Sequence, residues 1–303
     1  MSNPLLSTDA AWTILKLVRW ATEFMQQRGI DSPRTTAELL LAHALGLERL
    51  QLYVRYDQPL EKAELAAFRE LIQRRLRREP VAYILGRKGF WTLELQVGPE
   101  VLIPRPETEH LVEAALALLS QIANGRPARV LDLGTGSGAV VLALAAAAPQ
   151  HRYFASDVSS AALATARRNA LAAGSAGRVA FFAADWLAAL RGDAPPFDVI
   201  VSNPPYIARG ALAGLQPEIA LHEPRLALDG GEDGLRCHRV IIAEAGRHLC
   251  PGGALLLEIG SDQRQRVHAL AERAESYAEV QCLKDFAGCE RVMVLVKKNI
   301  ADH

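Results

Sequence analysis

The chain has 303 residues, half of them hydrophobic, with 34 basic and 34 acidic residues. This length allows one large or two ordinary domains with a sizeable core. A net charge of zero argues against a protein that binds nucleic acid through a broad basic surface. No apolar run approaches the length of a membrane span, and the first residues lack the pattern of a signal peptide.

The cysteines fall late in the chain, and no two of them form a C-x-x-C pair. A disulfide framework or a zinc site would show paired or regular spacing. We therefore expect reduced, partly buried thiols, no metal site and a cytoplasmic enzyme. The four residues are Cys237, Cys250, Cys282 and Cys289.

Residues 8 to about 79 are predicted to be helical. Thr8 or Asp9 can cap a first helix, which Gly29 ends. Ser32 followed by Pro33 predicts the start of a second helix that runs to residue 46. The apolar residues of the first helix follow helical spacing; they are Trp12, Leu15, Leu17, Val18, Ala21 and Phe24.

A third helix is expected at about residues 61–78, and it ends in the sequence RRLRR. Basic residues at a helix C-terminus are favoured by the helix dipole. An equally good interpretation is a patch that binds an acidic partner. The arginines concerned are Arg74, Arg75, Arg77 and Arg78.

A linker with a β-hairpin is predicted at residues 80–108. The run from Phe90 to Val97 alternates, and we expect it to pair with residues 101–104 through a turn at residues 98–100. The following segment, IPRPETE, has two prolines that stiffen the backbone, and Glu107 or Thr108 starts the next helix. It is either a stiff linker before a helix, or a segment whose residues Arg105, Glu107 and Glu109 border a cofactor or substrate pocket.

From residue 128, strands and helices alternate, which predicts an α/β fold with a parallel sheet. The expected strands are RVLDLG, YFASD, VAFFAAD and FDVIVS. Later strands are expected at ALLLEIG and around Val280 and Val292. Ligands bind beyond the carboxyl ends of such strands, and three consecutive strand ends carry residues typical of ligand binding, namely Asp157, Asp185 and Asn203.

The glycine-rich turn at residues 134–138 reads G-x-G-x-G, which differs from the dinucleotide fingerprint G-x-G-x-x-G. Glycines allow close approach of a ligand to the backbone and to the free N–H groups of the next helix. Asp157 follows Gly136 by 21 residues, close to the ~20 expected for a carboxylate that binds ribose hydroxyls. The pattern favours a nucleoside without phosphates, with Asp185 and Trp186 beside an adenine.

The fourth strand ends in Asn203-Pro204-Pro205-Tyr206. A Pro-Pro pair cannot continue a strand, because proline lacks the N–H donor. The amide side chain, stiffened backbone carbonyl and aromatic ring suit the binding of a planar amide or amidine nitrogen. The alternative is an ordinary strand-to-loop turn.

These motifs, in this order and spacing, resemble those of class I S-adenosylmethionine-dependent methyltransferases. With PVAYILG, FWTLELQV, IPRPETE and the helical region, the chain resembles, nearly end to end, the bacterial release factor glutamine methyltransferase family (PrmC, formerly HemK). That family methylates N5 of the glutamine in the Gly-Gly-Gln motif of class I peptide-chain release factors. IPRPETE separates it from a relative that methylates a ribosomal-protein glutamine. Ser137 stands where threonine is common, a neutral departure.

The resemblance implies a Rossmann-like sheet of seven strands, with the last antiparallel, in a methyltransferase domain at residues 109–303. It implies a helical substrate-recognition domain at residues 1–79, a linker with a hairpin at residues 80–108, and a monomer. The cofactor would be S-adenosylmethionine, with S-adenosylhomocysteine as product and no metal. The implied cofactor-binding residues are Gly134, Thr135, Gly136, Ser137, Gly138, Asp157, Asp185, Trp186 and Asn203.

An amide nitrogen is a poor nucleophile, so the expected task of the enzyme is alignment. The hypothesis is that the Asn203 side-chain oxygen and the Pro204 carbonyl accept hydrogen bonds from the substrate NH2 group and stabilise the charge that develops on nitrogen. Tyr206 would pack against the amide, and Pro205 would complete the pocket. Asn203, Pro204 and Tyr206 are thus the predicted catalytic residues.

Residues 208–236 form a long segment in which His222, Glu223 and Arg225 suggest catalysis, although a structural role covering the substrate is the favoured interpretation. Two rival functions remain. An amino-methyltransferase of nucleic-acid bases would need a recognition insert or a basic domain, and the sequence has neither, so no direct nucleic-acid partner is expected. A non-catalytic cofactor-binding adaptor would have no need of the NPPY sequence.

Overall fold

The computed structural model describes residues 12–122 and 126–299, apart from the side chain of residue 122. The chain divides into two compact units. The first comprises Met1–Gly86 and Gln216–His222, and the second comprises Arg87–Leu215 and Glu223–His303. The helical unit therefore continues past residue 79 and includes a segment from far along the chain. No helix among the described residues is long and apolar enough to cross a membrane.

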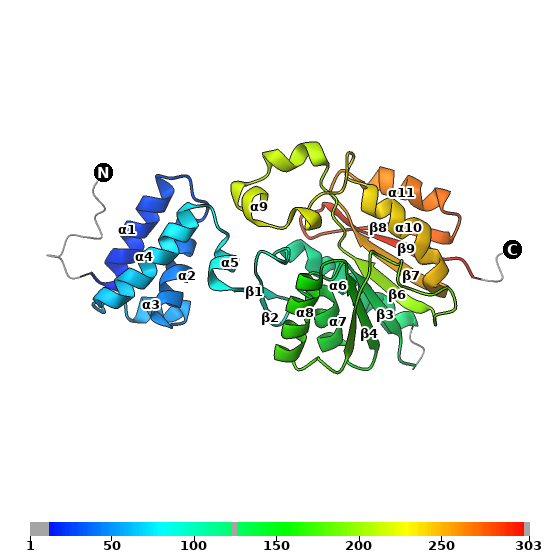
Figure 1. Ribbon diagram of the computed structural model, residues 1–303, viewed down its shortest axis with the longest axis horizontal. Helices are drawn as coiled ribbons and strands as arrows, with labels where there is room; N and C mark the ends of the chain where they lie inside the picture. The colour runs from blue at the N-terminus through cyan, green and yellow to red at the C-terminus, as the bar shows by residue number, and fades with distance from the viewer. Residues whose placement is uncertain (1–11, 123–125, 300–303) are drawn as a thin grey trace. The chain divides into compact units, whose positions relative to one another are not determined.

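The first unit is helical (Figure 1). Its core contains fully buried side chains from α1, α2 and α4, among them Leu17, Leu40 and Phe68. Thr13 caps α1, whereas the predicted caps Thr8 and Asp9 lie outside the described residues. Its helices are α1 (Ile14–Gln26), α2 (Pro33–Leu45), α3 (Arg49–Val54), α4 (Lys62–Leu76), α5 (Val81–Leu85) and α9 (Pro217–His222).

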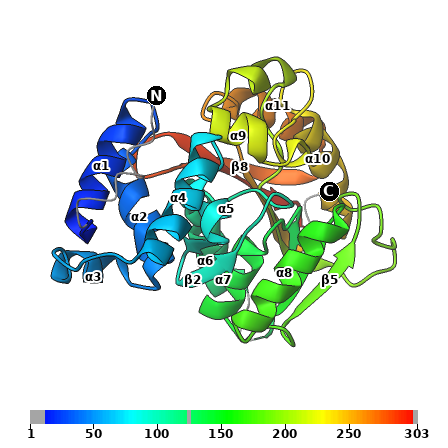
Figure 2. The same ribbon diagram turned by 60° about the vertical axis from the view of Figure 1, so that its left-hand side comes forward.

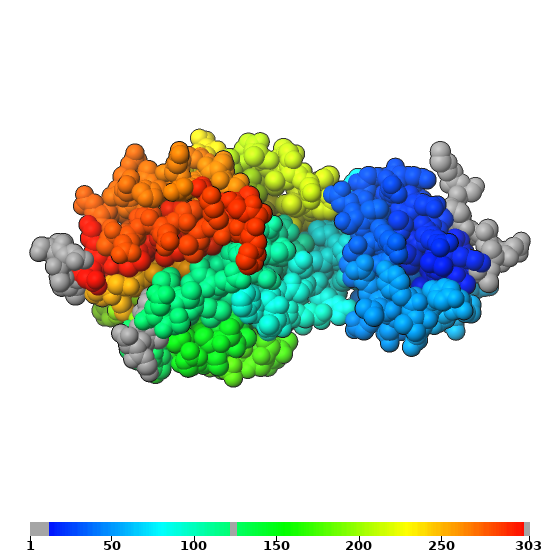
Figure 3. Space-filling view, turned by 180° about the vertical axis from the view of Figure 1, so that it is seen from behind, coloured from blue at the N-terminus to red at the C-terminus, as the bar shows by residue number. Residues whose placement is uncertain are grey.

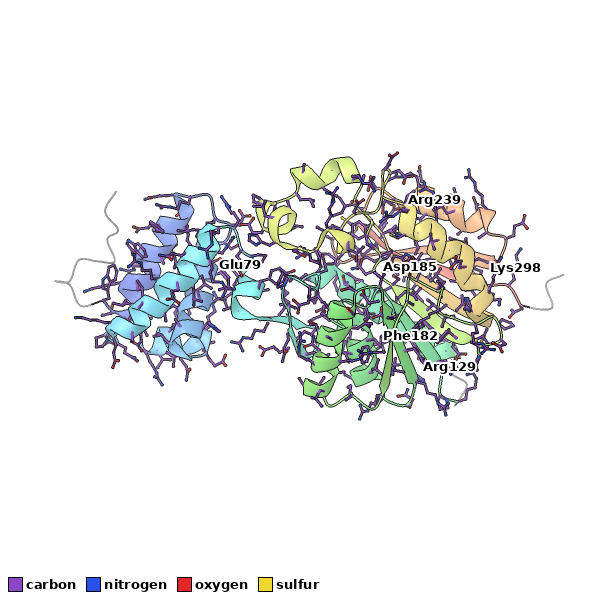
Figure 4. All side chains as sticks on the ribbon, in the orientation of Figure 1. Glu79, Arg129, Phe182, Asp185, Arg239 and Lys298 are labelled. Atoms are coloured by element: carbon purple, nitrogen blue, oxygen red, sulfur yellow. The ribbon has the colours of Figure 1, made fainter. Side chains whose placement is uncertain are left out.

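The arginine cluster at the end of α4 is mostly engaged inside the helical unit. Arg75, which is 4% exposed, donates to Glu218 of α9 at 2.7 Å, and Arg78 contacts the same carboxylate at 3.4 Å. Arg74 donates to Glu79, labelled in Figure 4, at 2.9 Å. The two pairs with Glu218 hold α9 on the rest of the helical unit, and of the four arginines only Arg77 is exposed. The contacts favour neither a simple helix-dipole role nor a free patch for an acidic partner.

The second unit is built on a seven-stranded sheet in the order β5-β4-β3-β6-β7-β9-β8. Neighbours from β5 to β7 are parallel, and β9 is antiparallel to β7 and β8, which confirms the predicted fold class. The edge strand β8 lies in the orange segment at the surface in Figure 3. The strands are β3 (Arg129–Leu133), β4 (Arg152–Asp157), β5 (Val179–Ala183), β6 (Phe197–Ser202), β7 (Leu249–Glu258), β8 (Tyr277–Lys284) and β9 (Glu290–Lys297).

Helices cover both faces of this sheet (Figures 1 and 2). One face packs on α6 (Glu109–Ile122), α7 (Ala139–Ala147) and α8 (Ser160–Ala172). The other packs on α10 (Arg236–His248) and α11 (Arg264–Arg273). All six residues of β6 are buried, as expected for a central parallel strand that helices cover on both faces.

The hairpin differs from the predicted one. Strand β1 (Arg87–Phe90) pairs with β2 (Leu93–Gln96), so the turn lies at residues 91–92, and residues 101–104 form no strand. Trp91 adopts a left-handed backbone with φ of 54°, and its N–H donates to Glu109 Oε1 at 2.8 Å. A tertiary contact therefore fixes a turn that lacks the usual Asn-Gly signal, and the prediction of a hairpin turn at residues 98–100 is wrong.

Candidate active site

A cavity of about 600 Å³ lies at the carboxyl edge of the sheet, within the second unit. Loops after β3, β4, β5 and β6 line it, together with residues 100–108 and the first turns of α10. Asp185, labelled in Figure 4, follows the end of β5 and lines the cavity with Cys237 of α10. Most predicted site residues meet here, namely Gly134, Thr135, Gly136, Ser137, Asp157, Asp185, Trp186, Asn203 and Pro205.

Asp157 holds the glycine-rich turn. Its Oδ2 accepts from the Gly136 N–H at 2.9 Å, and its Oδ1 accepts from the Ser159 N–H at 2.9 Å. Burial raises the pKa of this carboxyl, and these two backbone donors lower it. Because Gly136 has a φ of 56°, a glycine suits this position. The end of β4 thus fixes the turn after β3 at the wall of the cavity.

Two glycines shape the cavity through close packing. A Cβ on Gly134 would lie 3.4 Å from the ring of Trp186, so the turn and the indole are in contact. Gly138 is the N-cap of α7, and a Cβ there would lie 3.1 Å from Leu142 Cδ1 and 3.3 Å from Ala166 Cβ. Unlike the other turn residues, Gly138 does not line the cavity, and its position favours a packing role.

Asp132 is a site residue that was not predicted. It is 2% exposed, lines the cavity and accepts a hydrogen bond from Thr135 Oγ1 at 2.6 Å. Burial raises the pKa of its carboxyl to about 7, against the effect of the Thr135 hydrogen bond. The sequence does carry a signal for this residue, namely an acidic residue inside the apolar run of β3, because a buried acid needs a partner. This group can balance the positive charge of a ligand.

Asn203 lies at the end of β6, and its Nδ2 donates to Thr108 Oγ1 at 3.1 Å. Both residues line the cavity. In this orientation Asn203 Oδ1 is an acceptor to which no described residue donates a hydrogen bond. Thr108 was expected only as a helix start, and its contact with Asn203 joins segments that are 95 residues apart.

Two hydrogen bonds fix Tyr206 in place. Its hydroxyl donates to Glu258 Oε1 at 3.4 Å, and its backbone carbonyl accepts from Gln263 Nε2 at 2.9 Å. Burial raises the pKa of the phenol to about 12, so the hydroxyl stays protonated. Neither Tyr206 nor the buried Pro204 lines the cavity.

Of the three residues expected to border a pocket in IPRPETE, only Arg105 lines the cavity. Its Nη2 pairs with Glu223 Oε1 at 2.5 Å, and Glu223 Oε2 accepts from the Ile103 N–H at 3.3 Å. Glu109 instead holds the hairpin turn, and Glu107 does not reach the cavity. Glu223 is 6% exposed, and its contacts favour the structural interpretation of the segment after NPPY.

The sheet order, the glycine-rich turn and the cavity at its carboxyl edge define a methyltransferase fold of class I. The catalytic domain of hMettl16, solved in complex with MAT2A 3′UTR hairpin 6, superposes with a TM-score of 0.55 at 15% identity, over 70% of this chain and 77% of that one. The human METTL16 N-terminal domain in complex with SAH gives a TM-score of 0.50 at 16% identity, over 68% and 76%. These likenesses concern the fold alone.

Sequence comparisons narrow the class to one family. The PrmC N-terminal domain model matches residues 16–86, and the methyltransferase small domain model matches residues 108–223. The release factor glutamine methyltransferase of Caulobacter vibrioides is 42% identical over 285 residues, 94% of this chain and 96% of that relative. The Geobacter sulfurreducens relative of the same name is 43% identical, over 93% and 96%. The chain belongs to the release factor glutamine methyltransferase family.

Proposed function

We propose that the protein transfers a methyl group from S-adenosylmethionine to N5 of the glutamine in the Gly-Gly-Gln motif of class I peptide-chain release factors. One observation carries this proposal. A single cavity joins the glycine-rich turn and Asp157 to Asn203 of NPPY, in a chain whose relatives bear that name over nearly their full length. Its place would be the termination of translation.

The cavity residues suit S-adenosylmethionine. Asp157 would bind the ribose hydroxyls, and Asp185 with Trp186 would border the adenine. The buried carboxyl of Asp132 would sit near the amino-acid part of the cofactor and balance its positive charge. When bound, the cofactor supplies a methyl group already activated by its sulfonium, so the chemistry requires no metal. The product would be S-adenosylhomocysteine.

Alignment of the glutamine amide is the task assigned to NPPY. Asn203 Oδ1 and the Pro204 carbonyl would accept hydrogen bonds from the substrate NH2 group, which favours pyramidal nitrogen and stabilises its developing positive charge. The two prolines fix the direction of that carbonyl. Pro205 borders the cavity, and Tyr206 would complete the substrate pocket. The proton can leave after transfer, when the nitrogen is acidic, so no strong base is needed.

The chain is proposed to act as a cytoplasmic monomer without a nucleic-acid or membrane partner. Residues 1–79 would recognise the release factor, residues 80–108 would link the domains, and residues 109–303 would carry the methyltransferase. Exposed apolar side chains on α3 and directly after it suit contact with a protein; they are Leu50, Tyr53, Val54 and Tyr56.

The test is methyl transfer from labelled S-adenosylmethionine to three substrates: a class I release factor, the same factor with its Gly-Gly-Gln glutamine changed to alanine, and bulk DNA plus RNA. Label on the first alone is expected. Label on both factor forms would move the target to another residue, and label on nucleic acid alone would overturn the substrate. No label anywhere, with cofactor binding shown separately, would favour the adaptor.

A further inference from the structure

An exposed aromatic residue lies in the turn between the last two strands. Phe286 is 91% exposed, more than any other large apolar side chain in the described part of the chain. It belongs to the short turn at residues 285–289, which joins β8 to β9. Single exposed apolar side chains are common, so the surroundings of this ring decide whether it has a role.

The turn is held in one conformation. The carboxylate of Asp285 accepts from the N–H groups of Ala287 at 3.0 Å and Cys289 at 2.9 Å, and it pairs with Arg291 at 3.2 Å. The Asp285 N–H in turn donates to the carbonyl of Cys289 at 2.8 Å. The Phe286 ring is therefore presented on a fixed support, and a partner that binds it loses little entropy in ordering the turn.

The turn lies at the same edge of the sheet as Asn203. Ser202, at the end of β6, is paired with Leu257 of β7, and the next residue of β7, Glu258, is paired with Val292 of β9. Because β9 runs antiparallel to β7, the turn that precedes β9 lies at the carboxyl edge of the parallel strands. This is the edge that holds the cavity.

A contact with the start of α6 places the ring more closely. Phe286 packs edge-on against His110, with the ring centroids 4.6 Å apart and the planes at 67°. His110 follows Thr108 by two residues, and Thr108 lines the cavity and receives the Asn203 amide at 3.1 Å. Phe286 itself does not line the cavity. It lies beside the segment that forms one wall of it.

Two carboxylates accompany His110 on this segment. Glu107, His110 and Glu113 follow one another at a spacing of three residues, so they share one face of the helical segment. His110 Nδ1 lies 3.1 Å from Glu113 Oε2, and the Glu113 side chain is 46% exposed. Glu107, which does not reach the cavity, is exposed and has no ion-pair partner among the described residues.

Neighbouring arginines are engaged with other acids. Arg105 pairs with Glu223 at 2.5 Å, and Arg291 pairs with Asp285 at 3.2 Å. The surface beside Phe286 therefore combines an exposed ring with acidic groups. A ring face attracts a cation, and arginine both stacks on rings and pairs with carboxylates.

We propose that Phe286, Glu107 and Glu113 form a docking surface for a basic side chain, arginine or lysine, in the release factor segment beside the target glutamine. The inference rests on the proposed function, because it takes the release factor as the partner. The apolar stem of the basic side chain packs on the ring, and its charge lies by the carboxylates. The surface holds the segment that leads to Asn203 and takes no part in methyl transfer.

The first test is steady-state methyl transfer to a release factor, with S-adenosylmethionine saturating. Phe286→Ala is expected to raise the KM for the release factor by about 10-fold, as loss of an interface anchor does. The kcat and the cofactor Kd should stay within about twofold of wild type, and Phe286→Tyr should keep the KM, because it retains the ring. Leu171→Ala, at a side chain that is 73% exposed on α8, is the matched control and should leave all three unchanged.

The second test concerns charge. Glu107→Lys and Glu113→Lys should each raise the KM by about fivefold at low ionic strength and by less at high salt, since the charges are exposed and screened. Glu272→Lys, at a carboxyl that is 66% exposed, is the control. A release factor whose basic residues beside the glutamine are changed to glutamine should bind wild type more weakly and respond little to Phe286→Ala, because the same contact is lost only once.

A wild-type KM in Phe286→Ala would overturn the inference, and so would a loss confined to kcat or to cofactor affinity. Charge reversals that act no more strongly than Glu272→Lys would overturn the assignment of a basic partner. If Phe286→Ala changes the sedimentation of the protein but not its KM, the ring serves contact between two copies, which also contradicts the inference. Wild-type protein that methylates no release factor would overturn the proposed function and this inference together, whereas an active wild type separates the two.

Discussion

Asp157→Ala is predicted to weaken binding of S-adenosylmethionine by roughly 100-fold. In the structure the carboxylate already accepts from the N–H groups of Gly136 and Ser159. Two further bonds to ribose hydroxyls would contribute about 1.5–3 kcal/mol each, as bonds to a charged group do. We take the lower end, about 3 kcal/mol in all, because the side chain is partly exposed and water competes for it.

Isothermal titration calorimetry of the folded variants measures this loss. Asp157→Asn should fall between wild type and Asp157→Ala, because it keeps one acceptor oxygen but turns an NH2 group toward a backbone donor. Asp193→Ala is the control, at an ion-paired aspartate whose side chain is 71% exposed, and should bind as wild type does. Binding by Asp157→Ala within threefold of wild type would refute the ribose assignment.

The pH dependence of cofactor binding has a definite sign. Burial raises the pKa of Asp157 above its usual value, and only the ionised carboxylate accepts from both backbone donors and the ribose. Affinity should therefore decrease as the pH falls through this raised pKa, and Asp157→Asn should lose that dependence. An identical pH dependence in the two proteins would contradict the assignment.

The remaining predictions concern stability. Glu218→Ala leaves the buried guanidinium of Arg75 unpaired and should destabilise the helical unit by about 3 kcal/mol, measured by hydrogen exchange of α4 and α9. Glu94→Ala, which removes an exposed ion pair, is the control and should lower the free energy of unfolding by less than about 1 kcal/mol. Equal destabilisation by Glu218→Ala and Glu94→Ala would contradict the role of the buried pair. Burial lowers the pKa of His238 to about 4, so the fold holds it neutral while the unfolded chain protonates it near 6.5. The free energy of unfolding should therefore decrease as the pH falls from about 6.5 to 4. In His238→Gln the decrease of Tm over this pH range should be smaller than in the wild type. An equal decrease in both proteins would exclude His238 as its cause.

The alternating part of the chain could be predicted well from sequence. Short runs rich in apolar residues between turn signals predict strands, and β3, β4, β5 and β6 all occur at the expected runs. The end of the strand before Asn203 could be predicted because two prolines follow this residue. Parallel strand ends share one edge of the sheet, so the meeting of Asp157, Asp185 and Asn203 at one cavity followed from order alone.

The contacts that support the site could not be predicted, because they join segments far apart in the chain. Nothing local tells that Thr108 receives the Asn203 amide, or that Gln263 binds the backbone of Tyr206. The hairpin turn failed for a related reason, since Glu109 holds Trp91 in a conformation that local propensity disfavours. Membership of residues 216–222 in the helical unit depends on Glu218 and two distant arginines.

The central claim is that Asn203 aligns the glutamine amide for methyl transfer. The most direct test is the single-turnover rate of Asn203→Ala on a release factor, with cofactor and substrate saturating, beside its Kd for S-adenosylmethionine. Loss of one preorganised acceptor predicts a rate lower by about 10²- to 10³-fold, with the cofactor Kd within about tenfold of wild type. A wild-type rate in Asn203→Ala would contradict the account, and so would a loss found only in cofactor affinity.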